Sequence, residues 1–131
     1  MAEHAHAALV RRGYEAFSAG DPDTLRTLLT ADCTHHVPGN HPLSGDFKGI
    51  DAVLGYYGRL ATVSEGTFRV ELRHLFVDGR GHVMSVHRAT ARHAGKSLDQ
   101  VGGIVFRVVG DKVTDLDECV EDPAATDAFW A

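Results

Sequence analysis

The chain has 131 residues, of which 44% are hydrophobic and 24% charged, and its formal net charge at neutral pH is −5. This length and composition are typical of one globular domain with its own core, so we predict a single domain over residues 1–131. The acidic balance and the lack of basic runs interleaved with aromatic residues argue against nucleic-acid binding. No apolar stretch approaches the roughly 18 residues that a membrane-spanning helix needs, so we expect no membrane contact.

The N-terminal residues and the cysteines indicate the compartment. Residues 1–8 lack the basic and apolar segments of a signal peptide. Cys33 and Cys119 lie far apart in sequence, and we expect two free thiols in a reducing cytoplasm. A disulfide and a cysteine-centred active site are the alternatives.

Helical patterns occupy the first part of the chain. Apolar residues recur at three- and four-residue spacing from about Ala5 to Ala19, which predicts an amphipathic helix that ends at Gly20. Asp21 then caps a second helix, with Pro22 at its first position. The following pattern predicts a short strand over 33–37, a loop over 40–49 and a third helix over about 50–62.

The second half reads as an antiparallel meander that a final helix closes. Four runs rich in Val, Phe, Ile and Thr are separated by short turns that contain glycine, over 68–78, 82–93, 98–109 and 113–121. Within the third run, Gly102 and Gly103 predict a bulge or bend. The last helix is predicted over 123–130. Few helices against a curved sheet give an α+β domain with a cavity between the two layers.

Several segments, in order, resemble the SnoaL-like family, part of the broad fold group named for nuclear transport factor two and ketosteroid isomerase. They are YEAFSAGD (14–21), HVPG (36–39), PLSGDFKG (42–49), FRVVGDKV (106–113) and the tail over 121–130. The resemblance implies a cone-shaped α+β barrel, in which a curved antiparallel sheet wraps around N-terminal helices and encloses a pocket. The family includes polyketide cyclases, and the wider fold includes isomerases, epoxide hydrolases and plain binding modules, so the fold leaves the reaction open.

The final strand supplies the main candidate for acid/base chemistry. Side chains alternate across a strand, and the face with Leu116 and Glu118 is more apolar than its opposite, so Glu118 is expected to point inward. Related proteins often carry His-Trp-Asp here, and their functional acid is the aspartate. In this chain Leu116 stands at the histidine position and Glu118 at the acid position. The sequence therefore keeps the acid and lacks the expected histidine partner. A carboxylate at the cavity mouth or in a salt bridge is the alternative.

Histidine and tyrosine side chains supply further candidates. In the strand over 82–93, His87 shares a face with small residues and is expected inside, where a histidine suits proton transfer near neutral pH. His35 and His36 must face opposite ways, and the choice between them stays open, with His36 matching the family pattern. Tyr57 on the third helix is a candidate donor to a developing oxyanion. A structural histidine and a packed tyrosine are the alternatives.

The remaining predicted contacts line the same pocket. We expect catalytic roles for Glu118, His87, His36 and Tyr57, and substrate contacts from His35, Phe47, Val53, Gln100, Phe106 and Leu116. We expect neither a metal nor another cofactor. A metal centre built from His35 or His36 with His87 and Glu118, and with His74 as a further ligand, is the weaker alternative, because the spacing matches no metal motif.

Three functions follow from this pattern. The first is a cofactor-free acid/base enzyme of the isomerase, cyclase or epoxide-hydrolase type, acting on a hydrophobic substrate that bears oxygen. The second is a small-ligand-binding protein with the same pocket and no chemistry. The third is an interaction module that uses the outer face of the sheet. The resemblance also implies a homodimer through that face, where Met84, Val86, Val105 and Val109 could pack.

Overall fold

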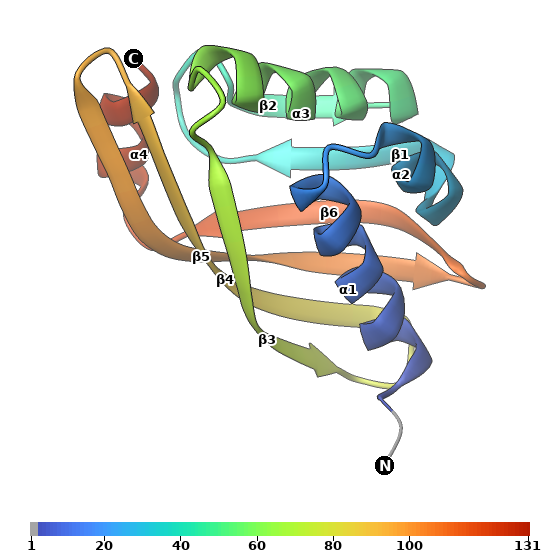
Figure 1. Cartoon of the computed structure of the whole chain (residues 1–131). Coiled ribbons are helices and arrows are strands. Elements are labelled where there is room, and N and C mark those ends of the chain that lie inside the picture. The colour runs from blue at the N-terminus through green and yellow to red at the C-terminus, as the bar shows by residue number, and fades with distance from the viewer. Residues whose placement is uncertain (1–2) are drawn as a thin grey trace.

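The computed structural model describes residues 3–131 as four helices and six strands (Figure 1). In chain order they are α1 (Ala5–Ser18), α2 (Pro22–Leu28), β1 (Leu29–Val37), β2 (Gly45–Lys48), α3 (Ile50–Val63), β3 (Arg69–Val77), β4 (His82–His93), β5 (Lys96–Val109), β6 (Lys112–Val120) and α4 (Pro123–Trp130). The N-cap of α2 is Asp21, whose side chain accepts a hydrogen bond from the backbone of Thr24, and Pro22 opens the helix as predicted.

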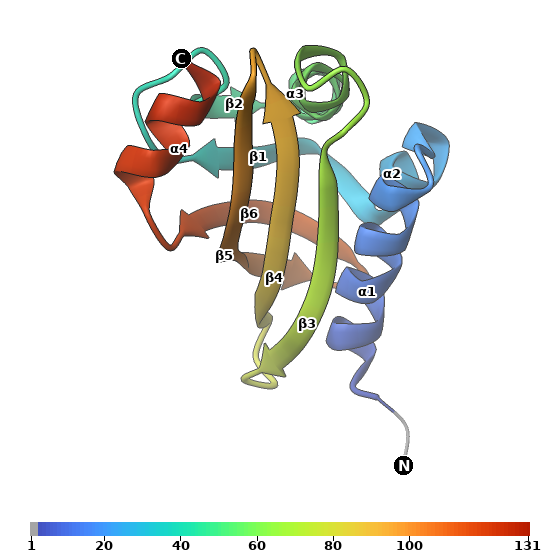
Figure 2. The same cartoon turned by 60° about the vertical axis from the view of Figure 1, so that its left-hand side comes forward.

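The strands form one curved, unclosed sheet in the order β2-β1-β6-β5-β4-β3. Figures 1 and 2 show α1, α2 and α3 against its concave side, while α4 lies near the turn that joins β4 to β5. The concave side therefore faces helices, and the convex side faces solvent. This arrangement matches the predicted cone-shaped α+β fold.

Three details of the sheet differ from the prediction. The sheet is mixed, because β1 pairs with β6 in parallel while the other neighbours are antiparallel. Short turns force consecutive strands to be antiparallel, but β1 and β6 lie far apart in the chain, so no turn fixes their relative direction. The predicted loop over 40–49 also contains the short edge strand β2, and β1 begins at Leu29, four residues earlier than expected.

The paired glycines of β5 allow a local bend against β4. A Cβ on Gly103 would collide with the backbone carbonyl of Ser85, and one on Gly102 would lie 2.8 Å from the carbonyl oxygen of Cys119. The β4–β5 ladder is interrupted between the pairs Met84–Val105 and His87–Gly102. Within the gap the amide of Ile104 donates to the Ser85 hydroxyl over 2.9 Å. The bend thus brings a serine side chain into the backbone hydrogen-bond pattern.

Two groups of buried residues form the core. The first joins α1 to β1, β5 and β6 through residues such as Val10, Cys33 and Phe106. The second joins α3 and α4 through residues such as Tyr56 and Trp130. Within residues 3–131, no helix combines the length and the apolar character needed to cross a membrane.

Candidate functional site

A cavity of about 120 Å³ lies between the concave face of the sheet and the helices. Most of its wall is apolar and aromatic, and no Lys or Arg occurs among its lining residues within the described range 3–131. The polar side chains in the wall are Tyr14, His35, His41, Tyr56, Tyr57, His87, Gln100, Glu118 and Thr126. A carboxylate is thus the only group in this described wall that carries a full charge when every histidine is neutral.

Glu118 on β6 is paired with a histidine of the neighbouring strand. Residues His35 and Leu116 are partners in the parallel β1–β6 register, which places the His35 side chain beside Glu118. The His35 Nε2 atom lies 3.0 Å from Glu118 Oε1, and the His35 side chain is only 2% exposed. The acid therefore has a histidine partner, supplied across the strand pair and not from position 116 of its own strand.

The same histidine contacts Tyr57 on α3 through its other ring nitrogen. His35 Nδ1 lies 3.0 Å from the Tyr57 hydroxyl. A carboxylate only accepts, so Nε2 donates to Glu118, and with a neutral ring Nδ1 then accepts from the tyrosine. Burial raises the pKa of Tyr57, and the negative charge of Glu118 raises it further, so the hydroxyl stays protonated. Both nitrogens of His35 are thereby occupied, which fixes the ring.

A second hydrogen-bonded group lies on another part of the wall. The hydroxyl of Tyr14 on α1 lies 2.6 Å from His87 Nδ1 and 2.7 Å from Ser85 Oγ, both on β4. Burial lowers the pKa of His87 against the opposing effect of the Glu118 charge, so the imidazole is neutral at pH 7. Burial also raises the pKa of Tyr14, with a smaller contribution from Glu118 in the same direction.

The structure places four predicted residues at the wall as strand alternation indicates. His87, Gln100, Phe106 and Leu116 all line the cavity. The Gln100 side chain is held by two contacts to the start of α4: it donates to the Thr126 hydroxyl over 2.8 Å and accepts from the Asp122 amide over 3.1 Å. That anchoring makes Gln100 a fixed part of the wall.

Three expected site residues lie outside the cavity. His36 occupies the outer face of β1, where its Nδ1 lies 2.6 Å from Asp46, so the inward position belongs to His35. Phe47 stacks on the ring of Tyr56 with centroids 4.5 Å apart, and so supports the wall from behind. Val53 is fully buried between α3 and the sheet. The apolar character of Phe47 and Val53 did not show whether these side chains line the cavity or lie in the layer of residues behind its wall.

The structure adds wall residues that the sequence did not single out. Tyr14, Ser85, Tyr56 and His41 line or support the cavity. Tyr14 belongs to the apolar stripe of the first predicted helix, and a hydroxyl on such a stripe is the signal that marks it. Tyr56 lies three residues after Val53 and four before Leu60, so the same helical spacing that favoured Tyr57 also marks Tyr56 as an inward position.

The positions of the histidine, acidic and cysteine side chains bear on the metal and disulfide alternatives. Among residues 3–131, no three or more His, Cys, Asp or Glu side chains come close enough to hold a metal ion. His36 lies on the other face from His87 and Glu118, and His74 is exposed on β3. Cys33 is buried and Cys119 exposed, and both are free thiols.

Two known proteins are similar to this chain over all or nearly all of its length. An uncharacterised protein of Mycobacterium tuberculosis, Rv0034, is 40% identical over 131 residues, which cover 100% of both chains. The structure of Bal32a, from a soil-derived mobile gene cassette, is 38% identical, covers 97% of each chain and superposes with a TM-score of 0.94.

A third neighbour shares the fold at lower identity. TerC, co-crystallised with polyporic acid, is 15% identical, with a TM-score of 0.83 over 96% of this chain and 98% of its own. A family model described as a SnoaL-like domain matches residues 10–116, a range that runs from α1 to the strand of Glu118. With its curved sheet, its helices on the concave side and this match over most of its length, the chain belongs to the SnoaL-like domain family.

Proposed function

We propose that this protein is an acid/base enzyme that acts on a hydrophobic, oxygen-bearing small molecule inside the cavity. The observation that carries the proposal is the Glu118–His35–Tyr57 arrangement, in which a carboxylate in an apolar wall is held by a histidine that is itself held by a tyrosine. Such an arrangement fixes the carboxylate for proton transfer in surroundings where water competes weakly. TerC, which shares the fold, was co-crystallised with polyporic acid, and this supports a small organic ligand.

In this mechanism Glu118 is the group that moves the proton. Its Oε1 accepts from His35, while Oε2 has no hydrogen-bond partner within residues 3–131 and belongs to a side chain in the cavity wall. The carboxylate takes a proton from a carbon next to a carbonyl. The electron pair of that C–H bond forms a C=C bond to the carbonyl carbon, and the π electron pair of the C=O bond moves to the oxygen, which gives an enolate. Where a C=C bond is conjugated with the enolate, return of the proton from Glu118 to the far carbon of that system completes an isomerisation. In a ring closure the enolate carbon attacks a second carbonyl of the same molecule, the π pair of that carbonyl moves to its oxygen, and Glu118 returns the proton to the resulting alkoxide.

Deuterium exchange tests this proposal before the natural substrate is known. The full chain is incubated in D₂O with an enolisable hydrophobic ketone, 2-tetralone, and the loss of the α-proton signals is followed by NMR. We expect catalysed exchange in the wild type and a loss of about 100-fold or more in Glu118→Gln, since general acid/base groups contribute about 10² to 10⁴. Asp46→Asn, on the outer face, is the matched control and should exchange like the wild type.

Native mass spectrometry distinguishes the enzyme from a binding protein. A small molecule that co-purifies, is released on denaturation and returns unchanged after incubation with fresh protein would support binding alone. If 2-tetralone and that molecule both bind and neither exchanges protons faster than in buffer, the enzymatic proposal is wrong. A co-purified molecule that the protein converts would identify the substrate class directly.

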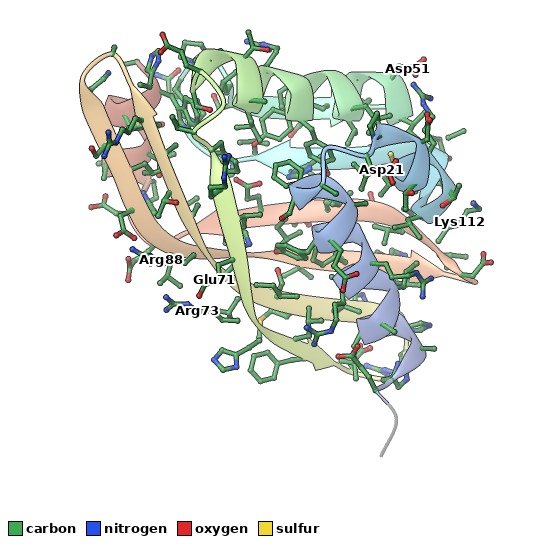
Figure 3. All side chains as sticks on the ribbon, viewed as in Figure 1. Asp21, Asp51, Glu71, Arg73, Arg88 and Lys112 are labelled. Carbon is green, nitrogen blue, oxygen red and sulfur yellow. The ribbon has the colours of Figure 1, made fainter. Side chains whose placement is uncertain are left out.

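We further propose that the protein forms a homodimer through the convex face of its sheet. Met84, Val105 and Val109 are 48%, 38% and 56% exposed there, which is unusual for apolar side chains on an open sheet face. Figure 3 shows the charged side chains of Glu71, Arg73 and Arg88 on the β3–β4 part of the molecule. Light scattering should give a dimer mass for the wild type at micromolar concentration and a monomer mass for Met84→Lys. A monomeric wild type would refute the interface.

A further inference from the structure

A chain of hydrogen bonds runs from the backbone of β5 to the ring of His87, and it determines which nitrogen of that ring carries the proton. The Ile104 amide donates to Ser85 Oγ over 2.9 Å. Ser85 Oγ lies 2.7 Å from the Tyr14 hydroxyl, which lies 2.6 Å from His87 Nδ1. The bend at the paired glycines makes the first link available, because a serine hydroxyl takes the place of a backbone carbonyl there.

The direction of the chain follows from counting protons. Ser85 Oγ accepts from the Ile104 amide, so its single proton goes either to the Ile104 carbonyl at 3.3 Å or to the Tyr14 oxygen at 2.7 Å. The shorter contact has the normal length of a hydroxyl–hydroxyl hydrogen bond, and the longer one exceeds it. Ser85 therefore donates to Tyr14, and the only proton of Tyr14 is directed at His87 Nδ1.

The surroundings keep both end groups in the required protonation states. Burial raises the pKa of Tyr14, so the tyrosine remains a donor, and it lowers the pKa of His87, so the imidazole remains neutral. A neutral imidazole that accepts at Nδ1 carries its proton at Nε2. His87 lines the cavity, and its Nε2 has no hydrogen-bond partner within residues 3–131.

We propose that Tyr14 and Ser85 hold His87 in the Nε2–H tautomer, so that His87 donates a hydrogen bond to the substrate oxygen while Glu118 moves the proton. Tyr14 is then a positioning residue, and His87 stabilises the charge that develops on the carbonyl oxygen. This role was expected of Tyr57, whose hydroxyl is instead committed to His35. The inference rests on the acid/base function proposed above for the same cavity.

The arrangement also defines the ligand class. Among the described residues of the wall, the polar groups without a partner include His87 Nε2 and the Tyr56 hydroxyl as donors, the only carboxylate is that of Glu118, and no Lys or Arg is present. A neutral carbonyl oxygen fits such donors, whereas a ligand carboxylate or phosphate would meet the charge of Glu118 without a compensating cation. The end of the substrate that enters the polar part of the cavity therefore carries an uncharged carbonyl group, as in a ketone, an aldehyde or an ester.

The tautomer can be measured without any substrate, so its outcome is independent of whether 2-tetralone is turned over. Long-range ¹H–¹⁵N correlation spectra of the full chain with ¹⁵N-labelled histidine, near pH 7, distinguish protonated from unprotonated ring nitrogens. We expect His87 to show a protonated Nε2 and an unprotonated Nδ1. Tyr14→Phe removes the donor and should shift His87 toward a mixture of both tautomers, and Ser85→Ala should shift it less.

The matched control is Tyr57→Phe, which removes a donor from the other histidine. It should change the signals of His35 and leave the tautomer of His87 unchanged. An Nδ1–H tautomer in the wild type would overturn the inference, as would a folded Tyr14→Phe protein whose His87 signals match the wild type. If Tyr14→Phe fails to fold, the wild-type tautomer and the Ser85→Ala spectrum still decide the question.

A kinetic comparison separates positioning from proton transfer. If His87 is the donor, Tyr14→Phe should slow the exchange of 2-tetralone by roughly 10-fold, less than Glu118→Gln, and bind the ketone with nearly unchanged affinity. The C=O stretch of bound 2-tetralone should lie at lower frequency than in water-free solvent and move back in His87→Phe. An unchanged stretch in that variant would show that His87 does not contact the carbonyl.

Discussion

His35 and His36 are adjacent on β1, yet they belong to two different environments. His35 is 2% exposed, with one ring nitrogen on Glu118 and the other on Tyr57, inside the cavity wall. His36 points to the outer face, where it pairs with Asp46 and its side chain is 40% exposed. One step along a strand therefore converts the same residue type from a fixed part of a buried hydrogen-bond arrangement into a solvated surface ion pair.

The comparison shows that a short distance to a carboxylate does not decide how much a histidine contributes to stability, whereas the removal of water around the pair does. Both histidines contact a carboxylate at 3.0 Å or less. On the surface, water replaces a lost partner, so the pair contributes little. In the wall, a lost partner leaves a buried group unsatisfied, which costs the full desolvation penalty.

The largest expected difference between the two positions is in stability. We expect His35→Ala to lower the free energy of unfolding by about 3 kcal/mol, because it leaves a void and removes the partners of Glu118 and Tyr57. His36→Ala should cost less than about 1 kcal/mol. Urea denaturation of both variants at pH 7 measures the two values. Equal losses would contradict the assignment of the inner and outer faces.

A second prediction extends the comparison to glycines. Gly103→Ala should destabilise the protein by roughly 2 kcal/mol, because its Cβ would meet the Ser85 carbonyl and push β4 away from β5. Gly58 lies exposed on α3, where an added Cβ would meet nothing within 4 Å, so Gly58→Ala should stabilise by up to about 1 kcal/mol. Thermal unfolding gives both shifts. A neutral Gly103→Ala would mean that the bend does not depend on close backbone contact.

The smallest expected effect is the pH dependence, and its sign differs between the two faces. Burial lowers the pKa of His87, so below about pH 6.5 the unfolded chain binds a proton that the folded state refuses, and stability falls. Asp46 raises the pKa of His36, so that pair stabilises the fold below about pH 6.5 and is lost as the pH rises.

Single substitutions separate these two contributions. His87→Gln should flatten the loss of stability between about pH 7 and about pH 5, and His36→Gln should steepen it. The measurement is the free energy of unfolding of the wild type and both variants across that pH range. All three proteins carry the same carboxylates, so the contribution of the carboxylates to the pH dependence cancels when each variant is compared with the wild type. The same change of slope in both variants would contradict the opposite placement of the two side chains.

Much of the fold could be predicted because it depends on local patterns. The helices over Ala5–Ser18 and Pro123–Trp130 and the strand over His82–His93 follow the spacing of apolar residues to within a residue or two. The parallel pairing of β1 with β6 could not be predicted in this way. No turn links the two strands, so only packing of the whole chain sets their direction and register.

The candidate site shows the same division. Alternation along β4 and β6 is a property of the chain itself, so the inward positions of His87 and Glu118 were accessible from sequence. The partner of Glu118 was not, because His35 precedes it by more than eighty positions and meets it only through the parallel register.

By itself, the sequence determined most of the elements, the family resemblance and the inward side chains of β4, β5 and β6, because these depend on spacing within one segment. The tertiary structure decided which inward groups meet. It paired Glu118 with His35, joined Tyr14 to His87 and moved Phe47 and Val53 behind the wall. The physical reason is that a hydrogen bond needs two atoms within about 3 Å, and between distant segments that proximity arises only when helices and strands pack together.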